Sequence, residues 1–217
     1  MYEVEAFREA RVEVMHALIK AHPLATLVTQ MTTGAQSLEA NHIPLLIDPE
    51  PAPFGTLRGH VARANPVWRT FNAAMEVLAV FQGPQGYITP SWYPSKAQHG
   101  KVVPTWNYAV VHAHGPLRVI DDAEWLRKLV TRLTASQESP RRKASPGDRP
   151  WQVTDAPADY IDTMLKAIIG IEIPVRRLQG KWKMSQNRLP QDRDGVIAGL
   201  EQRSDEASRA MLDALRW

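Results

Sequence analysis

Apolar and polar positions alternate in short runs along much of the chain, and helical spacing occurs near both ends and after residue 121. Four early runs rich in Val, Ile, Leu and Thr are separated by Gly, Pro and Asp, which is typical of strands joined by turns: LATLVTQ, SLEANHIPLLID, TLRGHVA and VLAVFQ. Residues 102–120 also alternate, with a break at Gly115-Pro116, and predict a strand pair or one bent strand. We expect a final strand in IEIPVRRLQGKWKMSQ.

Helical patterns flank these strands. Apolar residues recur at helical spacing over 4–21, and Asn65-Pro66 is typical of the start of a short helix. Asp121 and Asp155 each precede an apolar stripe, and the C-terminus has helical spacing. The polar, basic and proline-rich stretch 136–155 predicts an exposed loop. The order of elements favours an α+β fold, a mixed barrel with flanking helices, over a doubly wound sheet.

Length and composition narrow the class of protein. The 217 residues suit a single domain spanning 1–217, with an N-terminal helix and a helical C-terminal segment. The absence of cysteine excludes disulfides, zinc-thiolate sites and a cysteine nucleophile. The net charge of +3 gives only weak attraction to nucleic acid. Charged residues interrupt the opening segment, and no apolar run approaches the roughly 18 residues of a membrane span. We therefore expect a cytoplasmic protein with no membrane partner.

The first segment that could carry chemistry is RGHVARANP, residues 58–66. It brings His60 and Arg63 from the end of a strand to the start of a helix, where backbone N–H groups and the helix dipole favour an anion. A phosphate group would suit this corner. The alternative is that Asn65 only caps the helix and that Arg63 is a solvated surface residue.

Two further segments combine aromatic and polar side chains. TPSWYPSK (89–96) and VPTWNY (103–108) supply flat apolar faces with hydroxyl and amide groups, as a planar heterocycle needs. KWKMSQNR (181–188) adds cationic, hydroxyl and amide groups at a strand end. The alternatives are an aromatic cluster that closes a barrel end or a subunit interface, and a strand end with solvated lysines.

Other chemistry finds little support. His112 and His114 share one face of a strand, but no carboxylate lies at a spacing that would complete a metal site, and we expect none. The serines lie in no G-x-S-x-G motif, and neither the dinucleotide fingerprint nor the Walker loop occurs. We therefore assign no catalytic residue.

Taken together, these segments resemble the PaiB family of FMN-binding negative transcriptional regulators. The resemblance covers almost the whole chain and rests on motifs in order: NHIPLLID, GTLRGHVARANPVW, GYITPSWYPSK, VPTWNYAVVHAHGPLRVID and GKWKMSQNR, with DRDGV close behind. It implies an FMN-binding split barrel, a six-stranded antiparallel Greek-key barrel related to pyridoxamine-phosphate oxidases and flavin reductases. Such a protein works as a homodimer with its flavin sites at the subunit interface.

The resemblance also implies roles for individual residues. His60, Arg63 and Asn65 would lie near the flavin phosphate, with His42 on the neighbouring strand. The ring or ribityl chain would be flanked by Trp106, Asn107 and Tyr108, and the pocket would be completed by Lys183, Ser185, Gln186 and Asn187. One departure is that residues 62–64 read Ala-Arg-Ala, where the oxidases have a Ser/Thr-Arg-Lys phosphate clamp.

The resemblance is compatible with more than one class of function. As a regulator, the protein would use FMN or its redox state as a signal. DNA would be a partner, and the best candidates for touching its phosphates are Arg141, Arg142, Lys143 and Arg149, in a stretch that could equally be a solvated loop. The alternatives are a flavin-dependent oxidoreductase, such as a reductase or oxidase, and a haem-binding or haem-degrading split barrel that uses His99, His112 or His114.

Overall fold

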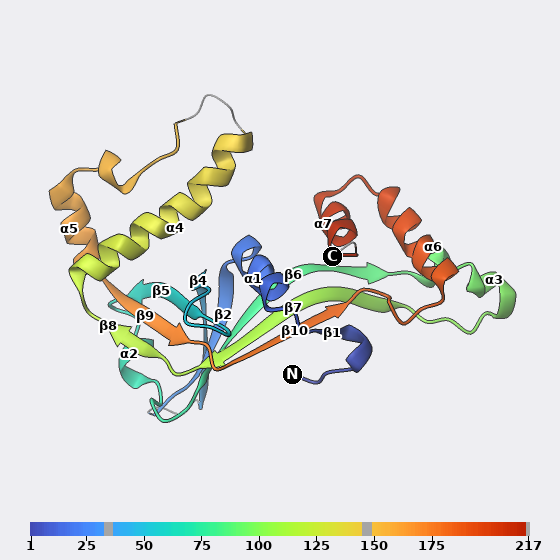
Figure 1. Ribbon diagram of the computed structural model, residues 1–217, viewed down its shortest axis with the longest axis horizontal. Coiled ribbons are helices and arrows are strands. Elements are labelled where there is room, and N and C mark those ends of the chain that lie inside the picture. Colours follow the sequence, from blue (N-terminus) through green and yellow to red (C-terminus); the bar gives the residue numbers. More distant parts are fainter. Residues whose placement is uncertain (33–36, 145–148, 216–217) are drawn as a thin grey trace. The chain divides into compact units, whose positions relative to one another are not determined.

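The computed structural model describes residues 1–32, 37–144 and 149–215, with the backbone alone for 140–144. Its contacts divide the chain into two compact units (Figure 1). Unit 1 comprises Met1–His22, Val80–His112 and Leu178–Trp217, and unit 2 comprises Pro23–Ala79 and Ala113–Arg177. The single-domain organisation expected from the sequence stays a prediction.

Unit 1 contains a sheet whose strands lie in the order β1 (Arg8–Glu9), β10 (Arg177–Lys183), β7 (Thr105–Gly115), β6 (Val77–Ile88). Helix α1 (Val12–Ala21) buries Met15, Leu18 and Ile19. Glycines let this helix approach the sheet, because a Cβ on Gly83 would lie 2.7 Å from Leu18 Cδ1. Side chains larger than hydrogen at such positions would force the helix away.

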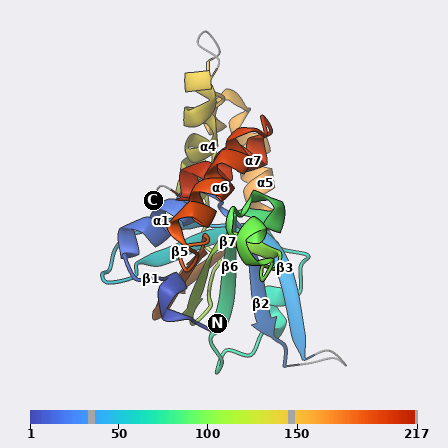
Figure 2. The same ribbon diagram turned by 90° about the vertical axis from the view of Figure 1, so that its right-hand side faces the viewer.

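The C-terminal helices of unit 1 are α6 (Pro190–Glu201) and α7 (Glu206–Leu215), which lie side by side in Figures 1 and 2. Unit 1 also contains the short helices η2 (Pro90–Trp92) and α3 (Ser95–His99), both of which contact α6. Gly199 of α6 packs directly on the Trp92 ring, where a Cβ would come within 2.3 Å of Cδ2. The buried carboxylate of Asp192 accepts hydrogen bonds from the Ser95 backbone N–H (3.1 Å) and hydroxyl (2.7 Å), which ties α6 to α3.

Unit 2 contains the antiparallel pair β2 (Leu24–Gln30) and β3 (Leu38–Pro44), with Thr26 opposite His42. A second antiparallel sheet has the order β4 (Leu46–Asp48), β5 (Thr56–Ala62), β9 (Ile168–Pro174), β8 (Arg118–Ile120). Leu57, Ile169, Ile171 and Ile173 are buried on these strands. The short helix α2 (Val67–Thr70) follows β5.

Helices α4 (Ala123–Ala144) and α5 (Ala158–Lys166), with η3 (Val153–Asp155), form the helical part of unit 2. Their shared core consists of Leu126, Val153, Ile161 and Leu165. The fold is therefore built mainly of antiparallel strands with flanking helices, as the sequence predicts. No helix within the described ranges is both long enough and apolar enough to span a membrane.

Four expectations about element boundaries were wrong. The run SLEANHIPLLID, expected as one strand, is divided between β3 and β4. The first helix begins at Val12 rather than residue 4, because Arg8 and Glu9 pair with Lys181 and Gly180 of β10 instead. The expected loop 136–155 is helical as far as Ala144, because α4 continues past the turns that pack into the core. The expected final strand is two strands, β9 and β10.

Candidate functional site

The first group of candidate residues lies in unit 1, where β7 and β10 are neighbours in the sheet. Asn107 is completely buried, and Ser185 is 3% exposed. The Asn107 amide nitrogen donates to the Ser185 hydroxyl at 2.9 Å, and that hydroxyl lies 3.2 Å from the amide oxygen, to which it can donate. Lys183 and Thr105 each lie two residues before this pair, and the Lys183 Nζ donates a hydrogen bond to the Thr105 hydroxyl. The structure thus joins two segments that are 78 residues apart.

The loop after β10 is held by its own side chains. Ser185 has φ of +62°, the left-handed region that non-glycine residues rarely adopt. The Gln186 side chain accepts from the Met184 N–H (2.6 Å) and donates to the Trp182 carbonyl. Asn187, next in the loop, is exposed. These bonds fix a short stretch of chain on which the side chains of Gln186 and Asn187 are exposed and that of Lys183 is half-buried.

Aromatic rings lie on β7 and β6, and those of Trp106 and Tyr108 point to the face of β7 opposite to Asn107, because successive side chains of a strand alternate between its faces. Trp106 is 54% exposed and contacts Tyr87 edge to face, with 6.4 Å between the ring centroids. Tyr108 is half-buried, and Lys181 Nζ lies 5.6 Å from its ring centroid. Large aromatic side chains exposed together are uncommon on a monomer surface and indicate a binding surface.

The second group lies in unit 2, around the start of α2. Asn65 Nδ2 donates to Asn41 Oδ1 at 2.7 Å, and Asn65 Oδ1 accepts the Val67 N–H at 2.9 Å. Asn65 therefore both opens α2 and fastens it to β3. His42 is exposed beside Asn41 on β3.

His60 lies on β5, opposite Gly170 of β9. Its Nδ1 is buried and has no hydrogen-bond partner among the described residues. Burial lowers the pKa of this imidazole below its usual value, because the charged form loses its hydration. A neutral ring with an unused nitrogen is suited to one further hydrogen bond.

Arg63 is occupied by protein partners. Its guanidinium makes two hydrogen bonds to Asp121 (2.6 and 2.9 Å) and donates to the carbonyls of Lys166 (2.8 Å) and Ile168 (3.3 Å). The hydrogen bonds from Arg63 hold the pKa of Asp121 below its usual value. A phosphate could use the guanidinium fully only by displacing the carboxylate, so Arg63 also has a structural role that the sequence did not reveal.

Several partners in these groups were missed by sequence reasoning. Thr105, Asp121 and Asn41 lie in segments that the sequence singled out, but their pairing with Lys183, Arg63 and Asn65 depends on the tertiary fold and leaves no local pattern. The seven residues between 106 and 187 that were assigned to one pocket all lie in unit 1, and the four assigned to the phosphate corner all lie in unit 2.

A sequence profile described as "Putative FMN-binding domain" matches residues 1–177. The Bacillus subtilis protein "Protease synthase and sporulation protein PAI 2" is 31% identical over 215 residues, which cover 99% of this chain and 96% of that protein. The chain belongs to the PaiB family of FMN-binding proteins. Protein AN0679 of Emericella nidulans is 37% identical and is matched over 100% of this chain and 96% of its own length.

Solved structures share the fold of this PaiB-family chain. The flavocytochrome Anf3 from Azotobacter vinelandii superposes with a TM-score of 0.58 at 10% identity, covering 84% of this chain and 72% of Anf3. The FAD and heme binding protein from Mycobacterium smegmatis gives 0.53 at 17% identity, covering 88% and 79%. The fold is the flavin-binding split barrel that the resemblance implied, and FMN is the cofactor of the family.

The residues present fit a flavin in part. Within unit 1 these are the exposed ring of Trp106, the exposed amides of Gln186 and Asn187 and the half-buried Lys183, and within unit 2, taken by itself, the unused Nδ1 of His60. These are the groups that bind the isoalloxazine ring, the ribityl hydroxyls and a phosphate. Arg63 fits less well, because Asp121 already neutralises it.

Proposed function

We propose that this protein is a cytoplasmic, homodimeric FMN-binding regulator that represses transcription. The observation that carries the flavin part is the exposed ring of Trp106, which contacts the exposed ring of Tyr87 edge to face, on the strand that carries Asn107 and Tyr108. Exposed aromatic faces suit a planar ligand, and the buried Asn107–Ser185 pair fixes the strand ends that carry the ligand-facing groups.

In this proposal each group of residues has a distinct task. Trp106 and Tyr108 provide flat surfaces for the ring, and Gln186 and Asn187 offer amide groups to its polar edge or to the ribityl chain. Asn107 and Ser185 hold the loop in place and, through it, the position of Lys183. When bound, FMN supplies redox chemistry, and the protein orients the ring and excludes water from it.

The phosphate end is assigned to His60, His42 and Asn65, all of which lie in unit 2. His60 is the strongest member, because its buried Nδ1 has no partner among the described residues. Arg63 contributes to anion binding only to the extent that Asp121 releases it. Family resemblance supports the homodimer, in which the exposed rings of Trp106 and Tyr87 would be covered.

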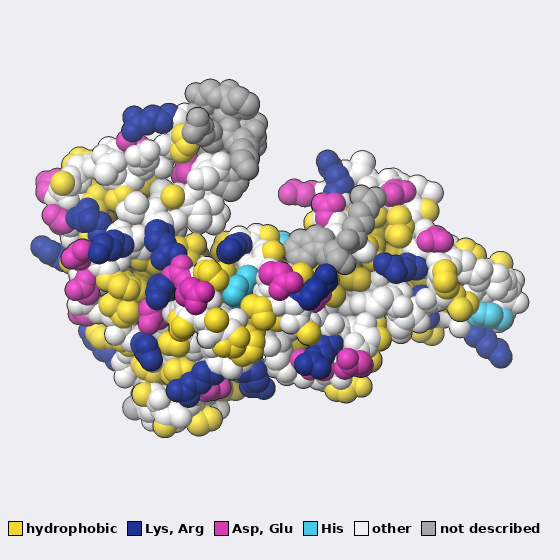
Figure 3. All heavy atoms as spheres, in the orientation of Figure 1, with side chains coloured by type: hydrophobic (Ala, Val, Ile, Leu, Met, Phe, Trp, Pro, Cys, Tyr) yellow, Lys and Arg dark blue, Asp and Glu magenta, His cyan; other side chains and the backbone are white. Residues whose placement is uncertain are grey.

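The regulatory part rests on the family and on α4. In its described part this helix carries Arg127, Lys128 and Arg132, which pair with Asp162, Glu124 and Asp48. Of the four basic residues proposed for DNA, Arg149 pairs with Asp155 at 2.5 Å, and the side chains of 141–143 lie outside the described residues. Figure 3 shows Lys and Arg interspersed with Asp and Glu over the visible face. Contacts to DNA phosphates would therefore compete with these ion pairs and weaken with salt.

Flavin binding is tested by titrating FMN with protein and following flavin fluorescence. We expect Lys183→Met to weaken binding by about tenfold, the equivalent of about 1.4 kcal/mol, and Trp106→Ala to weaken it similarly. Lys101→Met and Trp151→Ala are matched controls at exposed positions outside both groups. Equal affinities for all four variants would refute the assignment. The absorption spectrum of the purified protein separates flavin from the haem alternative, which would show a Soret band.

The regulatory part needs a separate experiment. A gel-shift assay on the protein's own upstream region, at two salt concentrations, should give a specific complex whose affinity falls as salt rises. A protein that binds FMN but shifts no DNA at either salt concentration would be an oxidoreductase candidate instead.

A further inference from the structure

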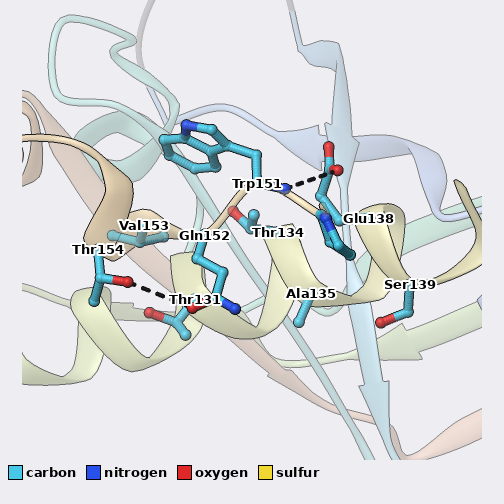
Figure 4. A pocket seen from close by; sticks show the side chains of 10 residues that line it. Thr131, Thr134, Ala135, Glu138, Ser139, Trp151, Gln152, Val153 and Thr154 are labelled. Atoms are coloured by element: carbon cyan, nitrogen blue, oxygen red, sulfur yellow. Dashed lines mark hydrogen bonds between the residues drawn. The ribbon is translucent and has the colours of Figure 1, made fainter. Parts of the chain in front are cut away.

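Unit 2 contains a cavity of about 680 Å³ between the C-terminal half of α4 and the segment before η3 (Figure 4). Its volume lies within the range of about 300–1,000 Å³ that is typical of small-molecule sites. None of the residues assigned to FMN lines it. Figure 4 shows segment 151–154 running alongside α4, with side chains from both elements around the cavity.

The wall contributed by α4 is one face of the helix. Thr131, Thr134, Ala135, Glu138 and Ser139 follow the spacing i, i+3, i+4, i+7, i+8. Earlier turns of the same helix bury Leu126 against Val153, with Val130 packed alongside. Beyond that core the inner face changes to small and hydroxyl-bearing residues, which leave space where close packing would otherwise continue.

Hydrogen bonds hold the opposite wall. Asp155 accepts from the Gln152 N–H at 2.9 Å and from the Arg149 guanidinium at 2.5 Å. The Trp151 N–H donates to Glu138 Oε2 at 3.2 Å and so connects the segment to the helix. The cavity is therefore formed before any ligand arrives, which reduces the entropic cost of binding.

The chemistry of the lining indicates the class of ligand. Threonine and serine hydroxyls and the Gln152 amide offer hydrogen bonds, while Ala135, Val153 and the 46% exposed Trp151 offer apolar surface. Among the described residues that line the cavity, none is Lys or Arg, and the one charged residue is the acidic Glu138. The described part of this lining therefore offers an anion no counter-charge and carries one negative charge itself, which disfavours a phosphate-bearing molecule such as FMN.

We propose that this cavity is a second binding site, separate from the flavin, for an uncharged and largely apolar small molecule with a hydrogen-bonding group. Its apolar body would lie between Ala135, Val153 and Trp151. Its polar group would bond to hydroxyls such as those of Thr134 and Thr131. Such a ligand would connect α4 to the segment that precedes α5.

The test compares two fluorescent probes that share one scaffold. N-phenyl-1-naphthylamine is neutral, and 8-anilino-1-naphthalenesulfonate adds a negative charge. Both are titrated into the full chain, with and without saturating FMN, and binding is followed by probe fluorescence. We expect saturable binding of the neutral probe, about tenfold or more tighter than that of the anionic probe, and no displacement by FMN.

Variants locate the probe. Ala135→Trp fills the cavity from α4 and should weaken binding of the neutral probe by about tenfold or more, whereas Ser136→Trp, at the exposed neighbouring position outside the lining, should leave it unchanged. Circular dichroism checks that both variants are folded. If Ala135→Trp does not fold, Thr134→Val, which keeps the side-chain volume but removes the hydroxyl, replaces it and should likewise weaken binding of the neutral probe. The proposal is overturned if the neutral probe shows no saturable binding, if FMN displaces it, if the anionic probe binds as tightly, or if the folded lining variants bind like the parent.

Discussion

Ser185 allows the contribution of a buried hydrogen bond to be separated from that of backbone strain. Its backbone conformation favours glycine, whereas its side-chain hydrogen bond favours serine. Its hydroxyl bonds to the buried Asn107 amide, while its φ of +62° is strained for any residue with a Cβ. Ser185→Ala removes the hydroxyl and leaves the buried amide without this partner, at a cost of about 1–3 kcal/mol. The strain stays, since alanine also has a Cβ.

Ser185→Gly loses the same hydrogen bond but relieves the left-handed strain, which is about 1–2 kcal/mol. Glycine also gains freedom in the unfolded chain, which offsets about 0.5–1 kcal/mol of that relief. We therefore expect both variants to be less stable than the parent, with the alanine variant less stable than the glycine variant by up to about 1.5 kcal/mol.

The assay is urea unfolding followed by circular dichroism, with Asn107→Ala and the double variant Asn107→Ala/Ser185→Ala completing a cycle. The double variant should be more stable than the sum of the single losses predicts, by about 0.5–3 kcal/mol. A glycine variant no more stable than the alanine variant would refute the backbone argument, and additive losses would refute the contact.

The remaining predictions concern titration, FMN binding and packing. Hydrogen bonds from Arg11 hold the pKa of the buried Glu9 below its ordinary 4.5, so its stabilising contribution is complete above that pH and is lost as the pH falls towards the lowered pKa. Urea unfolding followed as the pH is lowered from about 6 through 4.5, below which this contribution is lost, should be less pH-dependent in Glu9→Gln, and parallel profiles would contradict this. Burial lowers the pKa of His60 below 6.5, so stability should fall as the pH drops below that value, and His60→Gln should remove this dependence. In FMN titrations His60→Gln should also weaken binding by about tenfold, and an unchanged affinity would remove His60 from the site. Gly199→Ala should destabilise the protein by about 1–3 kcal/mol although alanine favours helices, because the new Cβ meets the Trp92 ring; a raised melting temperature would contradict the packing argument.

Sequence patterns predicted the elements that carry a clear periodicity. β2 and β5 were located to the residue, because apolar and polar positions alternate between turn signals. The N-terminal helix was drawn too long, since helical spacing continues through a segment that pairs with β10. The last turns of α4 were missed because a helix that leaves the core loses the apolar stripe that marks it.

The candidate site could be predicted as a set of segments but not as a set of contacts. Resemblance grouped 106–108 with 183–187, and the hydrogen bonds of Asn107 and Ser185 join those segments. The pairing of Arg63 with Asp121 depends on how the chain returns after β8, for which no local pattern exists. Likewise, the left-handed backbone of Ser185 would be expected at glycine or asparagine, and the sequence shows neither there.

Unit 1 is assembled from three separated stretches of chain, the last of which begins at Leu178. The region matched by the family profile ends at residue 177 and so omits this stretch. A recombinant fragment cut at the profile boundary would lack most of β10 and both C-terminal helices. A fragment that ends at residue 177 would therefore expose an unpaired sheet edge and would be prone to aggregate. It would also lack the residues after β10 that are proposed to contact the flavin.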